Sequence, residues 1–197
     1  MKNNIIKFSV VLTIITGFSV AILAFLNLKT QPLIQQHRLD EINNAVKEVM
    51  PQDVVQIEKK ETDGFTFYIG YSDDQKTNIA GYATIAYGKG YSSVIQALIG
   101  VDTTFTITGT KVIFQQETPG LGSKIEAMGK YNGKKQIWIH QFIGKKENNI
   151  FLDKDNPDKE NTIQALTGAT ISSRAVTKAI KKTLVELKNK TQNIGSE

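Results

Sequence analysis

Residues 8–28, FSVVLTIITGFSVAILAFLNL, form an apolar segment with no charged side chain. A helix rises about 1.5 Å per residue, so this segment would be about 31 Å long and would cross the hydrocarbon core of a bilayer. A buried helix of a soluble protein rarely has so long an uncharged run. A cleaved signal peptide has a shorter apolar region that ends in an Ala-x-Ala-like site, and Ala21 and Ala24 have the wrong spacing. We therefore predict an uncleaved, single-pass membrane anchor at residues 1–29.

The charges that flank this segment predict its orientation. Lys2, Lys7 and the terminal amine precede it, whereas Lys29 and Arg38 follow it. The positive-inside bias is slight and favours a cytoplasmic N-terminus. We expect the remainder of the chain on the outer side of the membrane.

Two later segments have the periodicity of amphipathic helices. In residues 33–50, apolar side chains recur at spacings of three and four, with Pro32 near the start and Pro51 just after the end, where helix boundaries prefer proline. In residues 172–190 the apolar face is formed by Val176, Ile180, Leu184 and Leu187.

Between these helices the pattern changes to strands. The segments are rich in β-branched and aromatic residues and are separated by Gly, Asp and Asn. They are residues 65–71, 79–87, 102–108, 111–115 and 136–144. The order of elements predicts an α+β fold: one domain at residues 30–190, with an antiparallel-rich sheet and flanking helices, and a short tail at 191–197.

Composition excludes several classes of site. The chain has no Cys, so it has no disulfides, thiolate metal sites, cysteine-ligated clusters or thiol nucleophiles. His37 and His140 have no carboxylate at ligand spacing, so we expect no metal site. The net charge of +5 is too small to indicate nucleic acid. Most of this excess lies in residues 171–197, where the basic face of the last helix is either simply solvated or docks an acidic partner or anionic lipid.

Three loops concentrate Gly, Ser, Thr and Pro. The first, residues 88–93 (GKGYSS), is a poor dinucleotide motif because Ser93 replaces the third glycine, and we expect a turn between strands. The second, residues 117–122 (ETPGLG), exposes backbone groups that can hydrogen-bond the edge of a planar heterocycle, or it is only a structural turn. Its Glu117 is a lone acid with no second carboxylate to form a general acid/base pair.

The third loop, Thr167-Gly168-Ala169-Thr170, directly precedes the last predicted helix. Unpaired N–H groups and the helix dipole favour an anion such as phosphate at this position. The alternative is that Thr170, Ser172 or Ser173 simply caps the helix, and we expect both serines to cap in either case.

Taken together, these loops and the anchor resemble the FMN-binding subunits of membrane respiratory complexes, most closely the G subunits of Rnf-type ion-translocating electron transport complexes. ETPGLG at 117–122 matches the family's flavin loop, TGAT at 167–170 matches its attachment motif, and GYSSVIQALIGVD at 90–102 resembles a third family segment. The chain departs from the family in having Gln164 where an Asp is usual, and Ser92 and Ser93 where a Gly pair is usual.

The resemblance implies that Thr170 carries covalent FMN through a phosphoester bond, formed by a separate FAD-dependent flavin transferase. The cofactor-binding residues that it implies are Thr170, Thr167, Gly168, Ala169, Glu117, Thr118, Gly120, Leu121 and Gly122.

The same resemblance implies an electron carrier without a substrate site of its own, located at the bacterial cytoplasmic (inner) membrane with its domain on the extracytoplasmic side. Its partners would be the other membrane and peripheral subunits of the complex, the flavin transferase and membrane lipid. Two alternatives remain: the C subunit of a sodium-translocating NADH:quinone reductase, and a membrane-anchored assembly module with no redox role.

Overall fold

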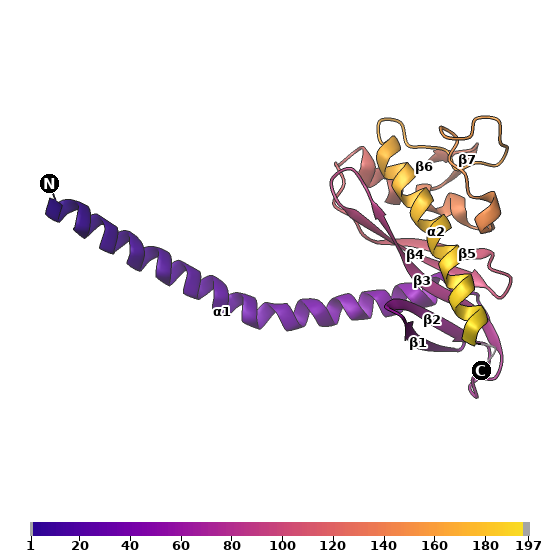
Figure 1. Ribbon diagram of the computed structural model, residues 1–197, viewed down its shortest axis with the longest axis horizontal. Coiled ribbons are helices and arrows are strands. Elements are labelled where there is room, and N and C mark those ends of the chain that lie inside the picture. Colours follow the sequence, from indigo (N-terminus) through magenta and orange to yellow (C-terminus); the bar gives the residue numbers. More distant parts are fainter. Residues whose placement is uncertain (1, 195–197) are drawn as a thin grey trace. The chain divides into compact units, whose positions relative to one another are not determined.

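The computed structural model describes residues 2–194, and the chain divides into two units, Met1–Asn43 and Asn44–Glu197. The first unit is formed by most of helix α1, Lys2–Val49 (Figure 1). Among the described residues, this is the one helix long and apolar enough to cross a membrane, with a mean hydropathy of 2.4 and no buried part in its apolar stretch. The hydroxyls of Thr13 and Ser19 donate to the carbonyls of Ser9 and Ile15, so these two hydroxyls are satisfied within the helix.

Helix α1 does not begin near Pro32, as the sequence pattern predicted, but passes through it. Proline removes one backbone donor and crowds the carbonyl four residues earlier, which weakens a helix locally. Here the segments on both sides of Pro32 are themselves helical, and one missing hydrogen bond does not separate them. The apolar and amphipathic segments therefore form a single element.

The second unit is built on a five-stranded antiparallel sheet in which each strand pairs with the next along the chain (Figure 1). Its strands are β1 (Gln56–Thr62), β2 (Phe65–Tyr71), β3 (Ile79–Lys89), β4 (Val94–Asp102) and β5 (Ile107–Phe114). The predicted strands at 65–71 and 79–87 are confirmed, and the predicted turn at residues 88–93 is confirmed at 90–93, because residues 88 and 89 still belong to β3.

The predicted strand at 102–108 is wrong, because Asp102 ends β4 and a turn follows before β5. The Asp102 carboxylate accepts hydrogen bonds from the backbone N–H groups of Thr104 and Thr106, at 2.8 and 3.0 Å. A short acid that bonds the backbone two residues ahead favours a turn over an extended strand.

The predicted strand at 136–144 is also wrong beyond its first residues. Strands β6 (Met128–Tyr131) and β7 (Lys134–Ile137) form a hairpin, and the chain then turns into a 3₁₀ helix, Trp138–Phe142. Trp138 and its neighbour Ile139 are both buried, whereas in a strand they would face opposite sides of the sheet. Two further 3₁₀ helices are Gly122–Glu126 and Glu147–Asn149.

Helix α2, Thr170–Ile194, packs against β3 and β4 (Figure 1). Its predicted apolar face is confirmed, since Val176, Ile180, Leu184 and Leu187 are each at most 1% exposed. The close approach requires Gly88 on β3, where an added Cβ would lie 2.7 Å from the carbonyl oxygen of Ala175.

The last turn of α1 belongs to the second unit and packs on the sheet. Ala45, Val46 and Val49 are buried, and the hydroxyl of Thr108 donates to the carbonyl of Val49 at 2.8 Å. A Cβ on Gly100 would lie only 2.1 Å from that same carbonyl oxygen. The glycine therefore allows the helix backbone to touch the sheet backbone.

Candidate functional site

The buried carboxylate of Glu117 joins two of the three loops that the sequence singled out to the first turn of α2. Glu117 is 5% exposed. Its Oε1 accepts hydrogen bonds from the amides of Ser92 and Ser93, both at 3.0 Å, and from the Ser93 hydroxyl. Its Oε2 accepts from the amide of Tyr91 at 3.1 Å and from the hydroxyl of Ser172 at 2.5 Å. The loop before β4, the loop after β5 and the first turn of α2 therefore meet at one side chain.

These hydrogen bonds decide the ionisation state of Glu117. Burial of the carboxylate raises its pKa, but the bond from Ser172 and those from the backbone amides outweigh burial and hold the pKa below its ordinary value. Glu117 is thus an anion at neutral pH. Both oxygens are already occupied by donors from the chain itself.

The prediction that Ser172 and Ser173 cap the last helix is wrong. Helix α2 begins at Thr170, so Ala169 occupies the cap position, where its carbonyl accepts the first helical bond from the amide of Ser173. Ser172 instead donates to Glu117, and the hydroxyl of Ser173 accepts from the amide of Leu166 and donates to the carbonyl of Ala169. Both serines therefore lie inside the first turn of α2. Their hydroxyls connect the helix to Glu117 and Leu166 and do not accept hydrogen bonds from the free amides of the helix.

As a result, the first turn of α2 has free backbone donors. Within residues 2–194, the amides of Thr170, Ile171 and Ser172 have no hydrogen-bond acceptor, and alanine at the cap position supplies none. These N–H groups and the helix dipole make this end of the helix electropositive. The predicted environment for an anion is therefore present beside Thr170.

The hydroxyl of Thr170 is also free. It has no hydrogen-bond partner within residues 2–194. Every fully buried side-chain oxygen in this part of the chain does have a partner, so the Thr170 hydroxyl is not one of the fully buried oxygens. Because the Thr170 side chain is only partly buried, its unpaired hydroxyl must be accessible to solvent. It does not act as a helix cap.

The turn before Thr170 is tight and depends on its glycine. The amide of Ala169 donates to the carbonyl of Leu166 at 3.1 Å, and Gly168 adopts a φ of +78°, which side chains disfavour. Thr167 and Gly168 are exposed. A Cβ on Gly168 would lie 3.1 Å from Cδ2 of Leu121, so the TGAT turn and the ETPGLG loop lie against each other.

The ETPGLG loop presents some of its residues and buries others. Its turn is closed by the amide of Leu121, which donates to the carbonyl of Thr118 at 3.1 Å. Thr118, Gly120 and Leu121 are exposed. Gly122 is buried, and a Cβ there would lie 2.7 Å from both Cβ of Glu117 and the hydroxyl oxygen of Ser172. Only glycine fits between those two residues.

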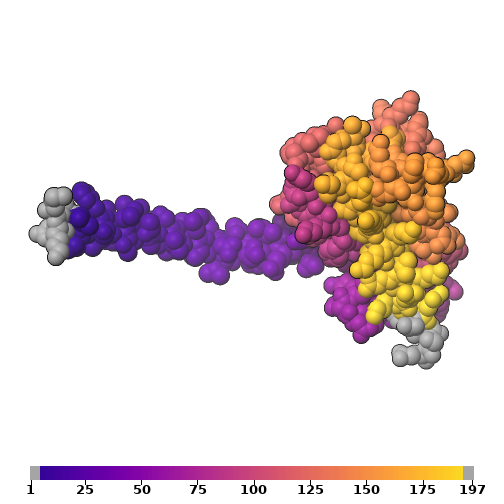
Figure 2. All heavy atoms as spheres, turned by 45° about the horizontal axis from the view of Figure 1, so that its top comes forward, coloured from indigo at the N-terminus to yellow at the C-terminus, as the bar shows by residue number. Residues whose placement is uncertain are grey.

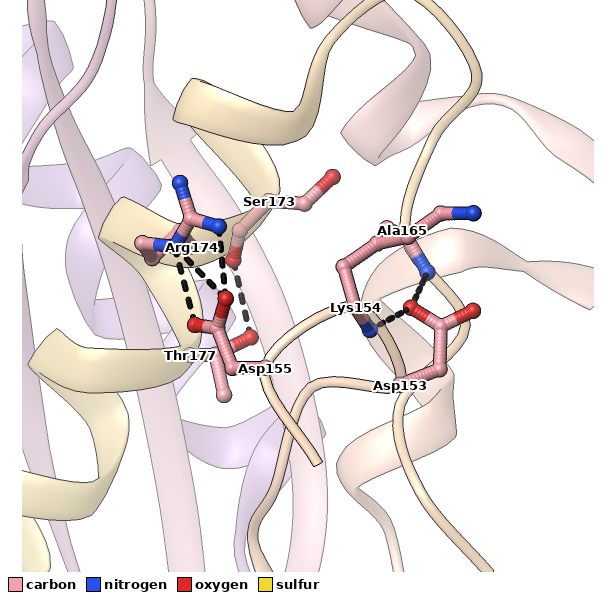
Figure 3. Close-up of polar contacts among 7 residues, drawn as sticks. All are labelled: Asp153, Lys154, Asp155, Ala165, Ser173, Arg174 and Thr177. Carbon is pink, nitrogen blue, oxygen red and sulfur yellow. Dashed lines mark hydrogen bonds and ion pairs between the residues drawn. The ribbon is translucent and has the colours of Figure 1, made fainter. Parts of the chain in front are cut away.

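The segment that leads into the TGAT turn is attached to α2. Figure 3 shows the guanidinium of Arg174 facing the carboxylate of Asp155, and its Nε and Nη2 donate to the two carboxylate oxygens. The same view shows the Asp153 carboxylate accepting from the amides of Lys154 and Ala165. The Arg174 guanidinium holds the pKa of Asp155 below its ordinary value. These contacts orient the chain between Asp153 and the turn.

Gln164 belongs to an uncharged network. Its Oε1 accepts from the amide of Asn132 at 2.7 Å, and its backbone carbonyl accepts from Nε1 of the buried Trp138 at 2.7 Å. The buried Gln141 bonds both Asn132 and the backbone of Gln164. Gln164 thus helps to place the chain six residues before Thr170, with no charge of its own.

The structure therefore brings together the loops at 90–93, 117–122 and 167–170, which the sequence could indicate only separately. The functional contact that sequence reasoning missed is Ser172 with Glu117. No spacing rule connects residues 55 positions apart, so the sequence has no signal for it.

Comparison with known proteins agrees with these features. Residues 90–185 match the FMN-binding domain family. The chain is 31% identical over 194 residues to the G subunit of the ion-translocating oxidoreductase complex of Vibrio atlanticus, covering 92% of this chain and 89% of the relative. It is 29% identical over 192 residues to the G subunit of the Na(+)-translocating ferredoxin:NAD(+) oxidoreductase complex of Acetobacterium woodii, covering 89% and 88%.

Among solved structures, the C subunit of the Na(+)-translocating NADH-quinone reductase of Parabacteroides distasonis aligns with a TM-score of 0.45 and 18% identity, over 74% of this chain and 79% of that one. The identity and coverage of the G-subunit relatives decide the family. The chain belongs to the family of G subunits of ion-translocating oxidoreductase complexes, with an FMN-binding domain that is matched over residues 90–185.

Proposed function

We propose that this chain is an electron-transfer subunit of a membrane-bound ion-translocating oxidoreductase complex, and that its FMN is bound covalently to Thr170 through a phosphoester. A flavin transferase would form the bond between the threonine hydroxyl oxygen and the flavin-side phosphorus of FAD, releasing AMP. When bound, FMN supplies one- and two-electron redox chemistry, and the chain supplies attachment, position and electrostatics.

The observation that carries this proposal is the state of Thr170. Its hydroxyl is free and accessible, and it stands at the first residue of α2 beside three backbone amides that have no acceptor within residues 2–194. A phosphate attached there would lie where the helix terminus favours negative charge. Gly168 and Ala169 keep bulky side chains away from the approach to the hydroxyl.

The other residues of the site divide into two groups. Thr167, Thr118, Gly120 and Leu121 are exposed on the two loops that meet at Gly168 and Leu121, and we propose that they contact the flavin, with the ETPGLG backbone facing its polar edge. Glu117 and Gly122 are buried. We propose that they act through the position of the loops, since both carboxylate oxygens of Glu117 already have donors from the chain.

The proposed location follows from the anchor. Helix α1 is apolar enough to span the membrane, and the slight excess of positive charge before the span favours an extracytoplasmic domain. There, covalent attachment keeps the cofactor from diffusing away. The chain would pass electrons between neighbouring subunits and have no substrate site of its own.

Mass spectrometry tests the attachment directly. The full-length chain is isolated from membranes of its native host, its intact mass is measured and its peptides are mapped. We expect the added mass of one FMN less one water on the peptide that contains Thr170. On a denaturing gel, the wild-type band should also fluoresce under ultraviolet light because the flavin is covalently bound. The Thr170→Val variant should lose both the added mass and this fluorescence, because Val has no hydroxyl. The Thr170→Ser variant should keep at least part of both.

Thr103→Val is the matched control, because Thr103 is exposed in the turn between β4 and β5 and has no hydrogen bond within residues 2–194. It should keep full modification. A wild-type peptide that is consistently unmodified would refute the electron-carrier proposal and favour the assembly module.

A further inference from the structure

The outward side of α2 carries a cluster of lysines beyond the attachment site. Lys178 and Lys182 are exposed and Lys181 is half-buried. With Val185, which is 43% exposed, and Asn189, they recur every three or four residues and so share one side of the helix. We call these five residues the lysine face. Figure 2 shows α2, in yellow, along the surface of the second unit.

The three lysines differ from the other described cations of α2 in forming no close ion pair, although Lys178 lies near enough to Asp155 to help lower the pKa of that carboxyl. Arg174, Lys188 and Lys190 form ion pairs with Asp155, Glu147 and Asp63. Lys178, Lys181 and Lys182 have no carboxylate oxygen within 4.0 Å in residues 2–194. In the described part of the chain, the fold thus pairs the cations on either side of the lysine face with carboxylates and leaves Lys178, Lys181 and Lys182 without a close ion pair.

A neighbouring segment adds a fourth cation. The ammonium groups of Lys159 and Lys181 lie 3.3 and 4.2 Å from the centroid of the Phe151 ring. Cation–π attraction to the same ring therefore places both cations beside Phe151, so that Lys159 adds to the positive charge of the lysine face.

The lysine face is hollowed and has an apolar part. It forms most of the lining of a shallow depression of about 680 Å³, to which Glu186 and Lys190 also contribute. Val185 and the methylene stems of the lysines supply apolar surface there. Glu186 places one carboxylate in this otherwise cationic hollow.

The lysine face is aligned with the proposed flavin site. At 3.6 residues per turn, Thr170, Lys178 and Lys181 lie within about 80° of one another around the helix axis. Lys178 is eight residues from Thr170, which is about 12 Å along the axis. A protein docked over these lysines would therefore be next to the residue that carries the cofactor.

We propose that the lysine face, together with Lys159, docks an acidic surface of a neighbouring electron-transfer protein subunit. The role in electron transfer rests on the function proposed above, whereas the docking itself does not require the flavin. Charge complementarity selects an acidic partner and steers its approach. Two features favour a protein over anionic lipid. A protein can present an apolar side chain to the hollow beside Val185 and a hydrogen-bond donor to the Glu186 carboxylate, both at fixed positions.

Carbodiimide cross-linking tests the contact, since it joins a lysine amine to a carboxylate that touches it. Host membranes that contain the tagged full-length chain are cross-linked, and the joined peptides are sequenced. We expect Lys178, Lys181 or Lys182 to be linked to Asp or Glu of another subunit of the complex. Absence of such links, while other lysines of the chain are linked, would overturn the proposal.

Charge reversal measures the energetic importance of the lysine face. The triple variant Lys178→Glu, Lys181→Glu, Lys182→Glu should co-purify with the cross-linked subunit about tenfold less at low ionic strength, with a smaller difference at high salt. The matched control reverses Lys130, Lys134 and Lys135, which are exposed on the β6–β7 hairpin. Equal losses in the two variants would show a net-charge effect and overturn the proposal.

A lipid contact is tested separately. The chain has no Cys, so Asn189→Cys can be labelled at one site with a polarity-sensitive dye. In phosphatidylcholine nanodiscs, adding phosphatidylglycerol should leave the emission unchanged, and a blue shift would overturn the proposal in favour of a membrane contact. The flavin fluorescence of the cross-linked chain tests the proposed function separately. If Thr170 carries no flavin but the lysines are still cross-linked, the flavin proposal fails and the docking proposal stands.

Discussion

The hydroxyl of Ser172 donates a 2.5 Å hydrogen bond to Oε2 of Glu117, and this bond joins the first turn of α2 to the loop after β5. The same carboxylate accepts from three consecutive amides in the loop before β4. A single charged group therefore decides how three segments meet around Thr170. The first three predictions below test this group and its surroundings.

Glu117→Gln should lower the free energy of unfolding by about 2–3 kcal/mol, because an amide has one acceptor oxygen and would leave buried donors unpaired. Denaturant unfolding of the full-length chain in detergent can be followed by the fluorescence of Trp138, which is fully buried. Glu61→Gln is the control, since Glu61 is exposed on β1 and should change little. A Glu117→Gln variant as stable as wild type would contradict this role.

The contribution of Glu117 should depend on pH. Its folded pKa is below the ordinary value of a glutamate, so the stabilisation is complete above the unfolded pKa and is lost as the pH falls through the folded pKa. The difference in unfolding free energy between wild type and Glu117→Gln should therefore be constant at neutral pH and shrink in acid. Urea midpoints measured from pH 7 downward check this, and a difference that grew in acid would show the opposite sign.

Gly122→Ala should disturb the contact between Glu117 and Ser172 by steric overlap. Its methyl group would lie 2.7 Å from the Ser172 hydroxyl oxygen and from Cβ of Glu117, so one of these must move, at a cost of about 1–3 kcal/mol. Gly120→Ala is the comparison, because it meets no atom within 4 Å and is strained only by its φ of +75°. Both variants should be less stable, but only Gly122→Ala should also reduce the pH dependence assigned to Glu117.

Gly100→Ala should separate the end of α1 from the sheet. The new Cβ would lie 2.1 Å from the carbonyl oxygen of Val49, a backbone atom that cannot rotate away, so we expect a loss of about 2–3 kcal/mol. Gly17→Ala, which meets no atom within 4 Å, should leave unfolding of the second unit unchanged. Trp138 fluorescence serves as the measurement here too, and equal effects would show that the contact is unimportant.

Much of the fold was predictable because its periodicity is local. The apolar run of α1, strands β2 and β3 and the buried face of α2 follow from spacings within a few residues. The failures occur where tertiary packing or a side chain overrides the pattern. Trp138 and Ile139 bury adjacent positions in a 3₁₀ turn, and the Asp102 carboxylate bonds the backbone ahead of it.

The candidate site was predictable only in parts. Family motifs indicated the loops at 117–122 and 167–170, and the structure places them together. The motifs could not show that Glu117 faces the protein interior or that Ser172 is its partner, because both facts depend on contacts between distant segments. The hydroxyl of Thr170 was open to two interpretations until the position of the first helical residue excluded a cap.

The sheet can form by closing successive hairpins, whereas the cluster around Glu117 closes only when residues 24 to 55 positions apart have met. Nascent or misfolded chains would thus lack the arrangement that displays Thr170. An enzyme that modifies this threonine in its native surroundings would act after the domain has matured, and the yellow colour of a purified preparation would then measure the fraction of molecules that completed folding.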